Sequence, residues 1–120
     1  MSALYLLLLL SQNGAGDINA SFVNSDSLDA CHQSMQLVES IFDSRRIPLL
    51  YKGCMPSSLR FTPFAHSDTT QVTRYHYLVG VNGDGFTIAP MDRESCLAQA
   101  HQQRGGEGMY CASSIQRLLE

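Results

Sequence analysis

Residues 75–111 read YHYLVGVNGDGFTIAPMDRESCLAQAHQQRGGEGMYC, and this stretch decides the fold that the sequence predicts. Aromatic and β-branched residues alternate with smaller or more polar ones over Tyr75–Val81, which is typical of a β-strand. The turn residues NGDG at 82–85 tolerate positive φ and predict a hairpin that returns the chain through Phe86–Ile88. The stretch therefore opens with two paired strands.

A helix and a third strand complete this unit. Asp92 can accept hydrogen bonds at a helix N-terminus, and a helix is predicted from there to about Arg104. A glycine-rich segment ends it, and a strand over 109–112 follows. Cys96 then lies in the first helical turn and Cys111 on a strand beneath it. This placement predicts a disulfide between helix and sheet.

The first half of the chain repeats this order of elements. Its leucine-rich strand, turn, alternating strand and closing strand fall at residues 4–10, 13–17, 18–22 and 49–54. Before the closing strand, Ser25 or Ser27 caps a predicted helix that carries Cys31. Both closing strands carry a tyrosine shortly before the cysteine and a Ser-Ser pair after it. The pattern predicts an internal duplication.

These elements predict an α+β fold: two tandem ββαβ units that form one mixed or antiparallel sheet with both helices packed on one face. With 120 residues the chain is expected to form a single domain. Its first half covers 1–60, a connecting loop covers 61–73 and the second half covers 74–120. A short helix is expected after Ser113, near the end of the chain.

The run Leu4–Leu10 resembles the apolar core of a signal peptide. However, no Lys or Arg precedes it and no clear cleavage site follows, which favours a central strand buried on both faces. It is also far shorter than the ~20 residues that a helix needs to span a bilayer. No membrane span is expected.

An aromatic strand, a turn, a cysteine at a helix start and an aromatic–cysteine closing strand together resemble small, mostly uncharacterised proteins of proteobacteria and their phages. The pattern lies on Phe22, Cys31, Tyr51 and Cys54, and again on Ile88, Cys96, Tyr110 and Cys111. The resemblance implies the fold and the disulfides but no activity. Those proteins usually hold one copy of the unit, whereas this chain has two.

Four cysteines allow three pairings, and the repeat selects Cys31–Cys54 and Cys96–Cys111. The loop-entropy model assigns each disulfide ~3 kcal/mol of stabilisation. Persistent disulfides predict an extracytosolic location, namely the periplasm, the cell surface or a virion. The alternative is a cytoplasmic protein with four reduced, buried thiols.

Catalytic, metal and cofactor sites are not expected. Structural zinc favours ligand pairs two to four residues apart, and the chain has no C-x-x-C motif. A cysteine nucleophile needs a lowered thiolate pKa, which the helix starts at Cys31 and Cys96 could supply, but the same positions suit a disulfide. A thiol redox enzyme or cysteine hydrolase is therefore the third hypothesis.

Charge is unevenly spread, with a net value of −3. Residues 1–44 contain five acids and no Lys or Arg, whereas 45–120 contain all eight basic residues and six acids. This pattern lacks the dense basic face of a nucleic-acid-binding protein. No nucleic-acid partner is expected.

The expected function is a non-catalytic structural or protein-binding module, for example a virion or cell-surface component. Its partner would be another protein or a second copy of itself, and a small-molecule ligand is not expected. The predicted contact surface consists of Phe61, Phe64, His66, Ile115, Leu118 and Leu119. The alternative is a small intracellular phage-type regulator that inhibits a host protein and keeps its cysteines reduced.

Overall fold

The computed structural model describes residues 4–12, 17–62, 74–83, 85–102 and 107–119. Within these ranges the elements follow in the order β1 (Tyr5–Gln12), β2 (Ile18–Ser25), α1 (Leu28–Ser44), β3 (Leu49–Pro56), β4 (Arg60–Phe61), β5 (Tyr75–Asn82), β6 (Gly85–Pro90), α2 (Arg93–Gln99), β7 (His101–Gln102), β8 (Gly108–Ser114) and β9 (Leu118–Leu119). Neither described helix is long and apolar enough to cross a membrane.

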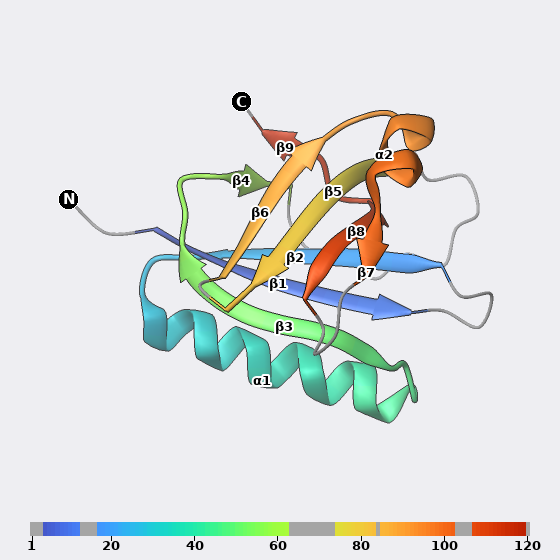
Figure 1. Cartoon of the computed structure of the whole chain (residues 1–120). Coiled ribbons are helices and arrows are strands. Elements are labelled where there is room, and N and C mark those ends of the chain that lie inside the picture. The colour runs from blue at the N-terminus through green and yellow to red at the C-terminus, as the bar shows by residue number, and fades with distance from the viewer. Residues whose placement is uncertain (1–3, 13–16, 63–73, 84, 103–106, 120) are drawn as a thin grey trace.

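One curled sheet holds most of the strands, in the order β3-β1-β2-β8-β5-β6, with β7 added beside β8 (Figure 1). Pairing is antiparallel throughout except between β2 and β8, which run parallel and meet at the pair Asn19 and Ser113. A separate two-stranded sheet joins β4 to β9. The sheet therefore has two antiparallel parts that join at one narrow point.

Strand β1 separates two hydrophobic cores. Because successive side chains on a strand point to opposite faces, Leu6, Leu8 and Leu10 face the inside of the curl, where they join Phe22 and Tyr77. Leu7 and Leu9 point outward, to Cys31, Val38 and Phe42 of α1. All five leucines are fully buried, which confirms the predicted central strand.

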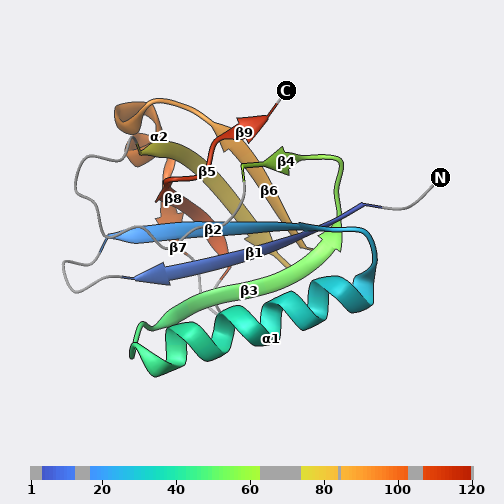
Figure 2. The same cartoon turned by 180° about the vertical axis from the view of Figure 1, so that it is seen from behind.

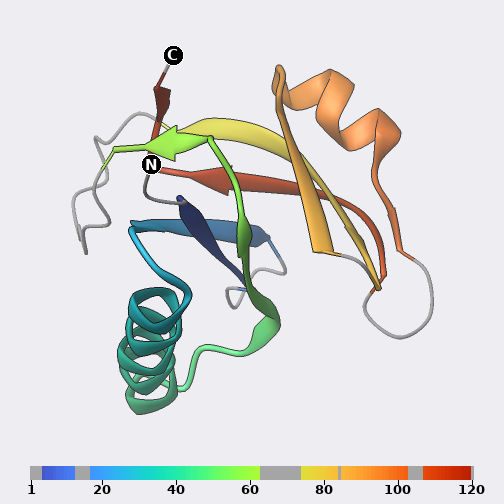
Figure 3. The same cartoon turned by 90° about the vertical axis from the view of Figure 1, so that its left-hand side faces the viewer.

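The predicted fold class is wrong. The described part of the chain is mostly strand, and its helices do not pack together on one face of a shared sheet. Figure 3 shows α1 beside β1–β3 and α2 on the far side of the molecule, beside β5 and β8. The physical reason is that the inner faces of the two strand sets, with Leu8 and Val79 among them, bury each other. Each helix then covers only the outer face of its own strands.

Helix α1 follows its sequence signals closely. The Ser27 side chain accepts a hydrogen bond from the Ala30 N–H at 3.1 Å, so Ser27 is the N-cap. After the last turn, Arg46 takes a positive φ of 57° and the chain reverses into β3. Figure 2 shows α1 running along the outer side of β3 for most of its length.

Two predicted helical segments differ in the structure. Helix α2 is capped by Asp92 as predicted, but it ends at Gln99 rather than near Arg104, because His101 and Gln102 pair with the edge of β8. The segment after Ser113 is not a helix, because β8 continues to Ser114 and 118–119 pair with β4. In both places the segment forms backbone hydrogen bonds with a neighbouring strand, β8 or β4, in place of a helix. Of the predicted connecting loop, Phe61 lies in β4, whereas 63–73 fall outside the described residues.

Candidate functional site

A groove of about 760 Å³ opens on the outer face of the sheet, at the point where β2 meets β8. Phe42 of α1 lines it on one side, and Arg93 and Leu97 of α2 line it on the other. The helices thus cover the outer faces of their own strands and leave this junction uncovered. We call this site the junction groove.

Arg74, directly before β5, crosses the narrow junction of the sheet. Its Nε and Nη2 atoms donate to the Ser113 hydroxyl at 3.3 and 3.2 Å, and Nη2 also donates to the Asn19 amide oxygen. Asn19 and Ser113 are the residues that pair β2 with β8. One guanidinium group therefore links the two parts of the sheet.

The other groove residues are mostly polar. Asp17 and His76 line it together with the arginines, and the hydroxyl-bearing residues are Ser11, Ser21, Ser113 and Ser114. Ile115 adds an apolar surface beside Phe42 and Leu97. The lining thus combines cationic, hydroxyl and apolar groups.

Ser113 and His76 lie opposite each other on β8 and β5, which raises the question of a Ser–His nucleophile. Such a pair needs the hydroxyl to donate to the imidazole. The Ser113 hydroxyl instead accepts a hydrogen bond from Arg74 and donates one to the Asn19 side-chain oxygen at 3.4 Å. This arrangement favours holding the arginine in place over activating a nucleophile.

Buried Gln116 joins the two halves beneath the groove. Its side-chain oxygen accepts from the Phe22 N–H at 2.8 Å, and its Nε2 donates to the carbonyls of Phe22 at 2.6 Å and Thr62 at 2.7 Å. The side-chain amide thus acts as a peptide group beside β2, where β8 has already ended. This role could not be predicted from the sequence, because a glutamine between Ile115 and Arg117 shows no local pattern.

The Tyr77 hydroxyl completes this buried network. It donates to the Gln116 carbonyl at 2.8 Å and accepts from the Leu118 N–H at 3.0 Å. Burial raises the pKa of Tyr77, an effect partly opposed by the hydrogen bond from Leu118. The phenol therefore stays protonated at neutral pH and keeps its donor role.

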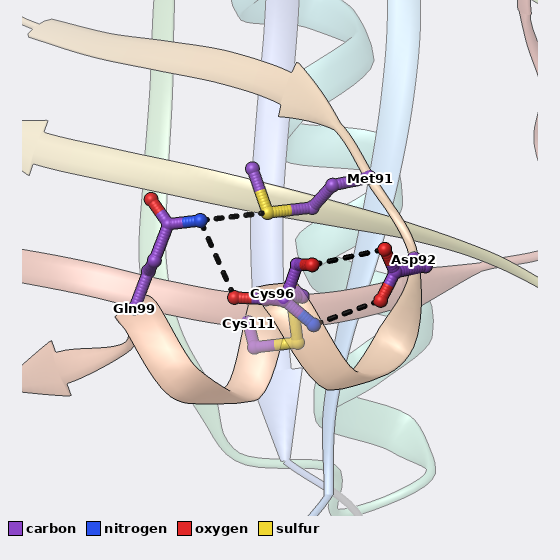
Figure 4. Close-up of a disulfide and its surroundings, with 6 residues drawn as sticks. Met91, Asp92, Cys96, Gln99 and Cys111 are labelled. Atoms are coloured by element: carbon purple, nitrogen blue, oxygen red, sulfur yellow. Dashed lines mark hydrogen bonds between the residues drawn. A yellow bond between two sulfur atoms is a disulfide. The ribbon is translucent and has the colours of Figure 1, made fainter.

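Both predicted disulfides are present. Cys31 of α1 is bonded to Cys54 of β3 with the Cα atoms 6.2 Å apart, and Cys96 of α2 to Cys111 of β8 with the Cα atoms 5.3 Å apart. Figure 4 shows the second disulfide between α2 and the strand beneath it. All four thiols are thereby used, and within the described ranges no group of three or more His, Cys, Asp or Glu residues could hold a metal ion.

The predicted contact residues fall into different environments. Phe61 is buried and stacks on Phe22 with ring centroids 3.8 Å apart, so it belongs to the core. Ile115 lines the junction groove, while half-buried Leu118 packs on the core and only Leu119 is exposed. Phe64 and His66 lie outside the described residues.

Neither arginine of the groove, Arg74 or Arg93, was among the predicted site residues. Arg74 lies at the end of a stretch without periodicity, and its partners Asn19 and Ser113 are 55 and 39 residues away. Only the tertiary fold brings them together. Comparison with protein-family models, with curated sequences and with solved structures gives no match for this chain.

Proposed function

We propose that this protein is a non-catalytic, disulfide-stabilised module that binds another protein in an oxidising, extracytosolic environment. The periplasm, the cell surface and a virion are the settings that this chemistry fits, and the virion agrees with the resemblance to phage proteins. The single observation that carries the proposal is that each helix beside the junction groove is covalently tied to the strand beneath it.

The Cys96–Cys111 disulfide fixes the wall of the groove that α2 forms. Cys111 itself lines the groove, and its partner Cys96 lies in α2, which also contributes Arg93 and Leu97. A recognition surface with walls that are already ordered loses less conformational entropy when a partner binds. This disulfide therefore supports binding as well as stability.

The cysteine chemistry favours this proposal over a thiol enzyme. Cys31 and Cys96 are fully buried and bonded, whereas a reactive cysteine is typically an accessible thiolate in an electropositive site. A disulfide whose helix-side sulfur is enclosed by protein is typical of a structural role.

An intracellular regulator with reduced cysteines is the second candidate, and the acidic helix α1 favours it. Asp29 and Asp43 are exposed on this helix, next to exposed Asp26, and Lys or Arg is absent from residues 1–44. Such a face could mimic an acidic ligand of a host protein.

The state of the cysteines in the native source distinguishes the two candidates. Thiols are alkylated at lysis, and peptides are analysed without reduction by mass spectrometry. The proposal predicts two linked peptides, Cys31 with Cys54 and Cys96 with Cys111. Four alkylated cysteines would contradict it and favour the intracellular regulator.

Protein binding is tested in the same source by chemical cross-linking of the intact cell surface, periplasm or virion. The proposal predicts cross-links from this chain to a second protein, lost when the disulfides are reduced beforehand. Cross-links that are unchanged after reduction would show that the disulfides do not shape the binding surface.

A further inference from the structure

The charge of the junction groove differs from that of the rest of the chain. Among the residues that line it, Arg74 and Arg93 are cationic and Asp17 is the carboxylate, although the chain as a whole carries a net charge of −3. We propose that the groove binds an acidic peptide segment of the protein partner, with its carboxylates on Arg74 and Arg93. This inference rests on the proposed protein-binding function.

The guanidinium group of Arg74 is already oriented before such a ligand binds. Its Nε and Nη2 atoms donate to Ser113 and Asn19, two neutral acceptors that fix the plane of the guanidinium group without neutralising its charge. No described residue accepts a hydrogen bond from Nη1. A guanidinium group pairs with a carboxylate through charge-assisted hydrogen bonds, and one that is already oriented loses little rotamer entropy on binding.

Arg93 offers a second cation from the other wall. It is exposed on the first turn of α2, and its side chain hydrogen-bonds to none of the described residues. The disulfide of α2 holds that turn against β8. The two arginines therefore come from separate elements that the fold keeps in place on one groove.

The size and the apolar lining favour a peptide over a small anion. About 760 Å³ is within the usual range of ligand sites, roughly 300–1,000 Å³, and is much larger than a phosphate group needs. Exposed Leu97 and half-buried Ile115 offer apolar contacts that a phosphate cannot use but that the side chains of a peptide can. A nucleic acid is disfavoured because two arginines do not make a dense basic face.

Fluorescence anisotropy tests the proposal with a fluorescein-labelled pentapeptide, Glu-Leu-Glu-Leu-Glu, and its amide counterpart, Gln-Leu-Gln-Leu-Gln. The oxidised full chain should bind the acidic peptide and not the amide peptide. Arg93→Gln should weaken binding about 10-fold, as expected for the loss of one charge-assisted contact. Arg60→Gln removes an equal charge at an exposed residue of β4 that lies outside the groove, and it should leave binding unchanged.

Arg74→Gln should weaken binding at least as much, but it also removes contacts that join β2 to β8. Arg74→Lys therefore accompanies it, because lysine keeps the charge but cannot make the paired Nε and Nη2 contacts to Ser113 and Asn19. Near-ultraviolet circular dichroism of each variant checks that the fold is retained.

Three results would overturn the proposal: equal affinity for the two peptides, equal weakening by Arg60→Gln and Arg93→Gln, or displacement of the acidic peptide by inorganic phosphate or a short single-stranded oligonucleotide at a lower concentration than by unlabelled peptide. The last result would assign the groove to a phosphate-bearing ligand. If the partner remains cross-linked to a chain that carries Arg74→Gln and Arg93→Gln, the groove inference is wrong while the proposed function stands. If no partner is cross-linked to the unaltered chain, the proposed function is wrong instead.

Discussion

Helix α1 buries Cys31, Val38 and Phe42 against the outer face of the sheet, whereas α2 buries only Cys96. The two helices have 17 and 7 residues. Because isolated helices shorter than about 12–15 residues are marginal in water, α2 depends strongly on how it is attached. The disulfide adds to a packed interface at α1, but at α2 it is the principal attachment. The two disulfides therefore differ in how much they contribute to holding their helices in place.

The largest effect is expected from the packed helix. Phe42→Ala removes a buried ring that contacts the outer leucines of β1, and it should lower the free energy of unfolding by about 3–5 kcal/mol. Leu97→Ala in α2 should cost little, because that side chain is 53% exposed. Urea denaturation of both variants measures the difference. Similar losses would show that α2 is also held by packing.

Variants without one disulfide distinguish its contribution to global stability from its contribution to the attachment of its helix. Replacing Cys96 and Cys111 by alanine, or Cys31 and Cys54 by alanine, should each lower stability by about 3 kcal/mol. The local results should differ. Amide hydrogen exchange should show lost protection throughout α2 in the first variant and retained protection in the centre of α1 in the second. Retained protection in α2 would contradict the inference that the disulfide is the principal attachment of this helix.

Local chemistry accounts for the elements that were predicted correctly. Leu4–Leu10 is too apolar for an edge strand, and the caps at Ser27 and Asp92 act within one turn of their helices. The Asn82–Gly85 pair closes the β5–β6 hairpin as its turn residues indicate. In each case the determinants are neighbours in the sequence.

The arrangement of those elements could not be predicted in the same way. The two antiparallel parts of the sheet are joined at a single parallel pair, Asn19 with Ser113, which are 94 residues apart. Gln116 and Arg74 complete that junction through side chains alone, so no strand or helix pattern reveals them. The junction groove follows from this arrangement and could therefore not be predicted from the sequence.

Unlike the disulfide variants, a substitution at this junction should lower the stability of both halves equally. Tyr77→Phe removes the hydroxyl that donates to Gln116 and leaves the Leu118 N–H without its acceptor. The expected loss is about 1–2 kcal/mol of global stability. Hydrogen exchange should increase by the same factor in the centres of α1 and β5. An increase confined to one half would show that Tyr77 supports only that half.

The smallest effect concerns the helix caps, which differ in their response to pH. The N–H and the hydroxyl of Ser95 donate to the Asp92 carboxylate at 2.8 and 2.9 Å, and these hydrogen bonds hold the pKa of Asp92 below its ordinary value (Figure 4). A lowered folded-state pKa means that the cap stabilises α2 fully above the unfolded-state pKa and loses this effect as pH falls through the folded-state pKa. Ser27, the cap of α1, does not titrate in this range.

In an acid titration followed by NMR, the first turn of α2 should therefore lose its cap while the first turn of α1 keeps its own. The Ser95 amide should shift and lose exchange protection below the ordinary pKa of an aspartate, while the Ala30 amide, which donates to Ser27, stays constant. Asp92→Asn is the matched control, because asparagine caps a helix equally well and carries no titrating proton. In that variant the pH dependence at Ser95 should vanish. If the Ser95 and Ala30 amides shift together in both proteins, acid acts on the whole fold, and the cap of α2 is not its pH-sensitive point.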